Sequence, residues 1–384
     1  MSHHSTVFSQ ILKFVPRHEF LSLAKKHDGA RRSDAMNRWT QFIAMSTAQL
    51  TGRASLRDIE STLASQRHLK YHLGSGAIKR TTLGRANQQL SFSFYEELFG
   101  KLYARCQSSS PGHKFRFKRK LFSLDASLLD VSMKVFPHAK YNCMKAAYKL
   151  HVGLDHDGLI PAFVAVTEGK MGDQTQAKLM NFPTGSVVVF DKGYADYAWH
   201  NQLTNKGIFW VTRIRGNAKY RVLERRSVNK DQGITSDQII EYTSDRSRKN
   251  NLRPVRRVGF YDAQNQKHYA FITNHLDWSA KTIADIYKQR WQVELFFKWI
   301  KQNLKIKAFI GNTDNTDNAV MTQVFVALCV YLILAYLKFQ GRIGHSLQQM
   351  SRLIHINLFA RRDFMALFKP PPDCISTTPQ LALL

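Results

Sequence analysis

The order of segments between residues 120 and 214 constrains the fold more than any other feature of this sequence. It reads as three strands, a helix, a strand, a helix and a strand, over residues 120–132, 145–155, 159–169, 172–182, 186–191, 195–207 and 208–214. Asp157-Gly158, a dipeptide typical of hairpin turns, separates the second strand from the third. The run VVVF at 187–190 is apolar throughout, as in a strand that is buried on both faces and pairs in parallel. We therefore expect an antiparallel meander followed by parallel strands with covering helices.

This order is that of the ribonuclease-H-like fold. We predict an α/β protein: a ribonuclease-H-like mixed sheet flanked by helices, with a β-rich insertion and an N-terminal helical domain. The helical domain covers residues 1–110, the ribonuclease-H-like domain covers 111–214 and 276–368, the insertion covers 215–275, and 369–384 form an irregular tail. Asp155 and Asp157 are expected to be turn residues, and Asp173 is expected to cap the helix over 172–182.

Two short helices in the first domain suggest a contact with DNA. Residues 55–66 begin with Ser55 and, three residues later, Asp58, which is a capping pattern. Residues 78–90 read as a second helix with Thr81 or Thr82 as its N-cap. Because basic side chains open this second helix, the pair resembles a helix-turn-helix in which Lys79, Arg80 and Arg85 contact DNA. An ordinary helical bundle with a basic surface explains the same pattern equally well.

The charge balance favours a polyanionic partner. The 384 residues include 56 Lys and Arg against 28 Asp and Glu, a formal net charge of +28. Nucleic acid is the commonest partner of so basic a chain, and an anionic membrane is the competing interpretation.

The longest apolar run, 324–337, has 14 residues, fewer than the ~20 of a membrane-spanning helix. No secretion signal opens the sequence, and the four cysteines form no CxxC pair. We expect a cytoplasmic, nucleoid-associated protein without disulfides or zinc.

Three carboxylates occupy informative positions. Asp125 lies in the first strand, Asp191 ends the apolar strand, and Glu294 lies in a late helix. Because ligands gather at the carboxyl ends of parallel strands, we expect Asp125 and Asp191 to share one site. Carboxylate oxygens favour Mg²⁺ or Mn²⁺ over zinc. Two such ions can support an in-line phosphodiester displacement, which would link the acids to the basic surface.

Glu294 belongs to a helix, 286–301, that is apolar on most of its faces. At ~100° per residue, four of its polar side chains fall within a sector of roughly 60°, and Lys298 lies beside it. These four are Tyr287, Arg290, Glu294 and Lys301. A helix apolar nearly all round packs inside a domain, so this stripe is expected to face a polar cleft. The alternative is a helix-stabilising pair of Arg290 and Glu294, which leaves Tyr287 and Lys301 without a role.

The pattern Tyr-x2-Arg-x3-Glu-x6-Lys, filled by these four residues, resembles the signature of bacterial insertion-sequence DDE transposases of the Tyr-Arg-Glu-Lys type. Asp125 in SLDAS and Asp191 in FDKGY match the family's two catalytic aspartates. A β-rich insertion before the glutamate and the N-terminal helical stretches also match, so the resemblance covers nearly the whole chain.

The resemblance implies a metal-dependent enzyme that cleaves DNA at the ends of an insertion sequence and joins them to target DNA. Asp125, Asp191 and Glu294 would hold two Mg²⁺ ions, for which Mn²⁺ may substitute. Tyr287, Arg290, Lys298 and Lys301 would contact DNA near the cut, and Tyr269 would stack on a flipped base, with Trp278 and Trp291 as weaker candidates. The partners would be the terminal inverted repeats and target DNA, bound by a homodimer. Two alternatives stay open: a catalytically inactive protein that binds the ends, and a ribonuclease-H-like nuclease.

Overall fold

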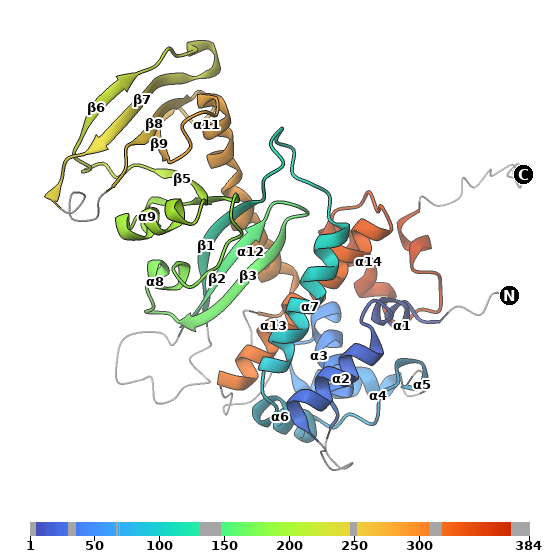
Figure 1. Cartoon of the computed structure of the whole chain (residues 1–384). Helices are drawn as coiled ribbons and strands as arrows, with labels where there is room; N and C mark the ends of the chain where they lie inside the picture. Colours follow the sequence, from blue (N-terminus) through green and yellow to red (C-terminus); the bar gives the residue numbers. More distant parts are fainter. Residues whose placement is uncertain are drawn as a thin grey trace, which may run out of the picture.

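The structure is a computed structural model that describes residues 5–29, 36–66, 68, 70–130, 147–245, 252–306 and 317–369. It consists of an extended mixed sheet and a group of helices that lie beside each other (Figure 1). All of the predicted tail except Lys369 lies outside the described residues, as do Cys143 and Cys374.

The described strands form one nine-stranded sheet in the order β3-β2-β1-β4-β5-β9-β8-β7-β6. Its first half consists of β1 (Leu121–Asp130), β2 (Ala147–Asp155), β3 (Ile160–Glu168), β4 (Val187–Phe190) and β5 (Phe209–Arg213). The first three strands pair in antiparallel fashion, while β4 lies parallel to β1 and to β5. The predicted meander and the predicted parallel pairing of the apolar strand are both confirmed.

The segment predicted as a β-rich insertion extends this sheet. Its strands are β6 (Tyr220–Arg225), β7 (Ile234–Tyr242), β8 (Val255–Asp262) and β9 (Lys267–Thr273), with the short 3₁₀ helix η5 (Lys230–Gln232) between β6 and β7. The last strand, β9, pairs antiparallel with β5, so backbone hydrogen bonds run without a break from the first half of the sheet into this segment.

Helices cover both faces of the first half of the sheet. α8 (Asp173–Ala177) and α9 (Tyr197–Asn205) lie on one face, while α11 (Ala280–Gln289) and α12 (Trp291–Asn303) lie on the other. Side chains of β4 alternate between these faces: Val188 and Phe190 join the α9 core, and Val187 and Val189 join the α11 core. Burial on both faces explains why this strand is apolar throughout.

The predicted role of Asp173 was wrong, whereas that of Asp155 is confirmed. Asp173 does not cap α8: it is the first residue of that helix, Gly172 precedes it, and its carboxylate pairs with Lys149. Asp155 begins the hairpin turn, where its Oδ1 accepts a hydrogen bond from the Asp157 N–H at 2.9 Å, as predicted. It is also the fully buried last residue of β2, because Lys120 and the hydroxyl of Tyr103 neutralise and hydrogen-bond its carboxylate.

The remaining helices pack into one group. They are α1 (Val7–Leu12), α2 (Arg17–Asp28), α3 (Arg38–Thr51), α4 (Leu56–Ser65), α5 (Lys70–Leu73), α6 (Arg80–Gln89), α7 (Ser93–Ser109), α13 (Asp317–Gln340), α14 (Leu347–Asn357) and the 3₁₀ helix η6 (Met365–Phe368). The predicted cap of α4 is confirmed, since the Ser55 side chain accepts a hydrogen bond from the Asp58 N–H. The predicted cap of α6 was wrong, since the helix begins at Arg80 with Lys79 in the N-cap position and no side-chain cap.

The long apolar helix α13 has 24 residues, more than the predicted 14-residue run, and is long and apolar enough to cross a membrane by length and composition. In the structure, however, 89% of its most apolar window is buried inside the protein. It packs against α7, α3 and α6, so it serves as the central core helix of the helical group.

The helix predicted over 286–301 is divided at Arg290 into α11 and α12. Arg290 keeps helical backbone angles, but the Arg290 and Val293 N–H groups bond to carbonyls three residues earlier, which tightens this turn. The expectation of nearly complete burial was also wrong, because Leu295 is 42% and Trp291 is 55% exposed.

Candidate active site

The strand register brings two predicted acids together. β1 and β4 run parallel with Leu124 opposite Phe190, so Asp125 and Asp191 are the next residues on neighbouring strands. Side chains alternate along a strand, which places Asp125 on the face of Leu121 and Asp191 on the face of Val189. Leu121 and Val189 belong to the core under α11, so both acids lie on the side of the sheet that α11 and α12 cover.

Arg290, at the junction of the two helices, joins Asp125 to Glu294. Its guanidinium Nη1 lies 3.5 Å from Asp125 Oδ2, and its Nη2 donates to Glu294 Oε1 at 2.5 Å. Asp125, Arg290 and Glu294 are partly buried and form one cluster. In it, the Arg290 guanidinium lies between the carboxylate of Asp125 on β1 and that of Glu294 on α12. The Arg290–Glu294 pair expected as the alternative therefore exists, but it also reaches the sheet.

Asp191 is held by two other side chains. Arg213, at the end of β5, donates to Asp191 Oδ1 from Nη2 at 2.6 Å and from Nε at 3.2 Å. The hydroxyl of Tyr287, on α11, donates to the same oxygen at 3.1 Å. Because Tyr287 and Arg290 are one turn apart, α11 links the Asp191 contacts to the Asp125–Arg290–Glu294 cluster.

Burial and charge separate the two aspartates. Burial raises the pKa of Asp125 from 3.8 to about 6; the Ala126 N–H and Arg290 oppose this rise, and the charge of Glu294 adds to it. Burial would also raise the pKa of Asp191, but the hydrogen bond and charge of Arg213 outweigh it and hold that pKa below its ordinary value. Burial raises the pKa of Tyr287 to about 12, so its hydroxyl stays protonated and donates.

The two predicted lysines differ in their surroundings. Lys301 Nζ donates to Ser127 Oγ and to the Leu128 carbonyl, both at 2.7 Å, and so fastens α12 to β1 two residues beyond Asp125. Lys298 is exposed on α12.

The basic residues predicted to contact DNA from the helical group do not join the acids. Lys79, Arg80 and Arg85 are exposed on and beside the first turns of α6, in that group (Figure 1).

A cavity of about 230 Å³ adjoins the acids. Basic and aromatic side chains dominate its lining, which consists of Arg213, Phe260, Asp262, Tyr269, Phe271, Ala284, Tyr287, Lys288, Arg290 and Trp291. Tyr269 stacks on Phe271 with ring centroids 6.0 Å apart, and Phe271 stacks on Tyr287 at 4.6 Å. Tyr269 and Trp291 thus both reach this cavity, whereas Trp278 lies outside its lining.

Sequence reasoning missed Arg213 and gave Tyr194, in the FDKGY motif, no role of its own. Arg213 closes an apolar strand, and nothing in its local sequence indicates that it faces an acid 22 residues away. Tyr194 ends the 3₁₀ helix η4 (Lys192–Tyr194), directly after Asp191, and is buried with a hydroxyl that has no hydrogen-bond partner in the described chain. Burial raises the pKa of this hydroxyl, with further contributions from Asp125 and Asp173, so it stays protonated beside the acids.

The chemistry of these side chains fits a divalent cation. The donors are carboxylate oxygens, which are the ligands that Mg²⁺ prefers, and a positive charge already lies between two of them. The unpartnered Tyr194 hydroxyl provides a further oxygen beside them. Within the described ranges, no three His, Cys, Asp or Glu side chains are close enough to hold an ion together, and Arg290 and Arg213 lie against the carboxylates.

In α/β sheets, ligands gather beyond the carboxyl ends of parallel strands, and here Asp125 and Asp191 lie where the parallel pairing of β1 and β4 ends. Residues 116–333 match the transposase DDE domain family, and residues 3–75 match a domain of unknown function. A protein of Sinorhizobium fredii named as the transposase y4zB is 30% identical over 294 residues, 76% of this chain and 80% of that protein. A protein of Geobacillus stearothermophilus, named as the transposase for insertion sequence element IS5377, is 27% identical over 67% of each chain.

Among solved structures, a piggyBac transposase synaptic complex with hairpin DNA matches with a TM-score of 0.47 and 11% identity, covering 96% of this chain and 83% of that one. The chain belongs to the DDE transposase family, as the family match over more than half of its length shows. The predicted class, a transposase of an insertion sequence, is confirmed.

Proposed function

We propose that this chain cleaves DNA at the ends of an insertion sequence and joins the freed ends to target DNA, with Asp125, Asp191 and Glu294 holding divalent ions. One observation supports this most: three acids, in β1, directly after β4 and in α12, are bound by two arginines and Tyr287 on the same side of the sheet. Mg²⁺ is the ion that this donor set favours, and Mn²⁺ can substitute for it. Bound ions would stabilise the attacking and leaving oxygens of an in-line phosphodiester displacement.

The protein's own groups would bind and orient the DNA strand. Arg290 and Arg213 offer guanidinium groups that suit paired contacts with phosphate oxygens. Tyr287 offers a protonated hydroxyl from the same helix as Arg290. Lys298 and Lys301 would contact the backbone farther along α12, and Lys301 also positions β1 next to Asp125. Arg290, Arg213 and Tyr287 are at least partly buried, which strengthens their electrostatic contacts, since less water screens them.

The cavity beside Tyr269 would accept an unstacked base. Its volume of about 230 Å³ and its aromatic and basic lining suit a flat heterocycle attached to a phosphate. Tyr269 lies on β9, the last strand of the 215–275 segment, with its ring parallel to Phe271 within 11°. A base stacked there would lie between the sheet extension and α11.

We further propose a ribonuclease-H-like core for residues 111–214 together with α11 and α12, extended by the 215–275 segment. The sheet order β3-β2-β1-β4-β5, antiparallel in its first half and parallel in its second, supports this. The helical group, with Lys79, Arg80 and Arg85 exposed at α6, would bind the terminal inverted repeats, and two copies would act together on paired ends. In that group α4 packs against α6, and Figure 1 shows α5 beside α4.

The test is cleavage of duplex DNA that carries the inverted repeats flanking the gene. Asp191→Asn should abolish Mg²⁺-dependent cleavage while it leaves binding of the same DNA nearly unchanged, because the carboxylate is lost and the basic surface is not. Lys206→Gln, an exposed residue after α9, is the matched control and should cleave normally. Undiminished cleavage by Asp191→Asn would overturn the proposal. Binding without cleavage by the wild type would favour an end-binding protein, and cleavage without strand transfer would favour a nuclease.

A further inference from the structure

A loop between α7 and β1 presents positive charge without acidic partners. Residues 113–119, HKFRFKR, form this basic loop, in which Lys114, Arg116 and Lys118 are exposed and alternate with Phe115 and Phe117. None of these three cations forms an ion pair or hydrogen bond with the rest of the described chain. The next lysine, Lys120, is instead bound to two acids. Figure 1 shows the loop as a projection between the helical group and the sheet.

The base of the basic loop is fixed by polar contacts. His113 Nε2 lies 2.7 Å from the Arg119 carbonyl and so closes the loop across its two ends. The His113 N–H donates to Asp157 Oδ1 at 2.8 Å, and Lys120 Nζ lies 2.6 Å from the other oxygen of that carboxylate. A loop held at both ends loses little conformational entropy when its charged side chains meet a ligand.

The phenylalanines of the loop point inward and form part of a stack of rings. Phe115 stacks on Phe117 with centroids 5.1 Å apart, Phe117 stacks on Trp278 at 4.9 Å, and Trp278 stacks on His275 at 3.8 Å. The apolar side chains are therefore used within the protein, and the outer face of the loop offers cations alone. A membrane-binding loop would present the apolar side chains instead.

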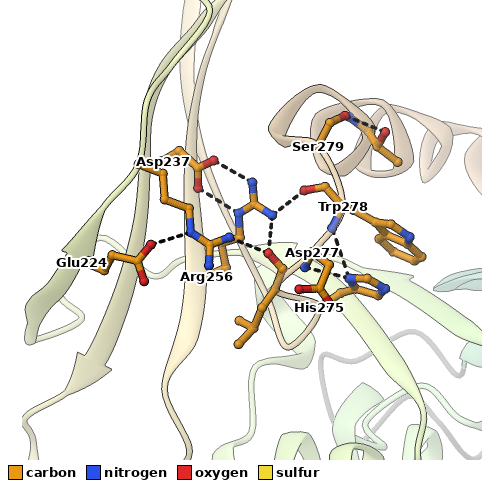
Figure 2. A network of polar contacts seen from close by, with 10 residues as sticks. Glu224, Asp237, Arg256, His275, Asp277, Trp278 and Ser279 are labelled. Carbon is orange, nitrogen blue, oxygen red and sulfur yellow. Dashed lines mark hydrogen bonds and ion pairs between the residues drawn. The ribbon is translucent and has the colours of Figure 1, made fainter.

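The stack ends on the segment that precedes α11. A network of hydrogen bonds and an ion pair holds that segment to the strands of the 215–275 part of the sheet. Figure 2 shows Arg256, on β8, paired with Asp237 of β7 and donating to carbonyl groups of this segment. Arg256 Nη1 donates to the Leu276 carbonyl at 2.7 Å and to the Trp278 carbonyl. Ser279 then caps α11, the helix that contains Tyr287 and ends before Arg290. The basic loop is thus packed against the start of the helix that serves the acids.

We infer that the basic loop is a binding surface for the phosphate backbone of duplex DNA. Its packing against the start of α11 holds it at a fixed position relative to the candidate active site. This inference deepens the proposed function and depends on it, because it assigns a further stretch of the same DNA to this surface. Three exposed cations on a closed loop neutralise up to three phosphates. Contacts with phosphates do not depend on the base sequence of the DNA. The loop would therefore support binding to any duplex that extends past the cleavage point.

The test is the salt dependence of binding to a labelled 40-base-pair duplex of random sequence, measured by fluorescence anisotropy without divalent ions. The loop variant combines Lys114→Gln, Arg116→Gln and Lys118→Gln. Each lost phosphate contact lowers the slope of log K against log salt by about 0.9, so the slope should fall by about two to three. The control variant, with Lys206→Gln, Lys219→Gln and Lys230→Gln, removes equal charge from exposed positions after α9 and in the sheet extension, outside the surfaces assigned to DNA, and should change the slope by less than one.

Equal slopes for the loop and control variants would overturn the inference, because the loop would then add only to the overall charge. In that case wild-type binding and cleavage would still support the proposed function. If the wild type itself showed no salt-dependent binding, both the inference and the proposed function would fall. All six substitutions are at exposed side chains, so matching circular dichroism and thermal unfolding should verify that the folds are intact.

Discussion

Asp125 and Asp191 are neighbours whose ionised forms have opposite effects on stability. Burial raises the pKa of Asp125 above its value in an unfolded chain, so the folded state binds more protons between pH 3.8 and about 6. The free energy of unfolding therefore falls as pH rises through that window and stays lower above it. The pKa of Asp191 is depressed by Arg213, so its ionised form adds stability above its unfolded pKa, and that stability is lost as pH falls.

Without divalent ions at pH 7, Asp125→Asn should raise the free energy of unfolding by about 1–3 kcal/mol, because the amide resembles the protonated acid. Asp191→Asn should lower it by about 1 kcal/mol, because Arg213 loses its partner. Urea denaturation with EDTA at a series of pH values measures both changes. The two variants are each other's controls, since they make the same substitution on adjacent strands. Differences of the same sign, or a difference for Asp125→Asn that persists below pH 4, would contradict the assignment.

At the level of residues, the sequence predicted those site members whose type and spacing are themselves unusual. Asp125 and Asp191 were found because an acid in an apolar strand needs a partner, and Tyr287 and Arg290 were found because they share a stripe with Glu294. Arg213 could not be found, because an arginine at a strand end is ordinary until the register shows what it faces. Whether these residues perform the proposed chemistry stays a prediction.

At the level of elements, the ion pair of Arg256 and Asp237 holds the start of α11 in place. Both side chains are only 5% exposed, and Arg256 also satisfies carbonyl groups of the segment before α11. Arg256→Met should lower the free energy of unfolding by about 3–5 kcal/mol, because it leaves Asp237 buried without a partner. Chemical denaturation gives this value.

The exposed pair of Arg221 and Glu241, in the same sheet extension, provides the matched control. Its side chains are 67% and 36% exposed, so Arg221→Met should cost less than about 1 kcal/mol. The double variant Arg256→Met, Asp237→Leu should recover part of the loss, since no buried charge remains. A cost for Arg256→Met as small as that of the control would show that the buried pair does not hold α11.

The types and order of the sheet elements were accessible from periodicity, but helix boundaries were not. Continuous apolar runs and a hairpin dipeptide predicted β1 to β5 in their observed order. The division at Arg290 left no trace in sequence, because the turn there contains neither Gly nor Pro. The cap of α6 was misplaced for a similar reason: threonines in the first turn suggested a cap, yet the helix begins before them.

At the scale of the whole molecule, helices from both ends of the chain share one core. The ring of Phe92, before α7, stacks on Phe325 of α13 with centroids 6.0 Å apart. Asn318, in the first turn of α13, accepts from the Phe92 N–H at 2.9 Å and donates to the Leu90 carbonyl at 2.7 Å. The sequence predicted a helical domain that ends near 110, because local patterns cannot show that a helix 200 residues later completes its core.

A fragment of residues 1–110 should therefore not fold by itself. Without α13 it would expose the apolar faces of α3, α6 and α7, and the buried area that offsets chain entropy would be lost. Circular dichroism should show reduced helix content and a gradual, non-cooperative thermal transition, whereas the full chain should unfold cooperatively under the same conditions. Adding a separate fragment of residues 317–369 should restore part of the helical signal, because it supplies α13 and α14. Sharp cooperative unfolding of the 1–110 fragment alone would show instead that the N-terminal helices form an independent domain, and that α13 only packs against its finished surface.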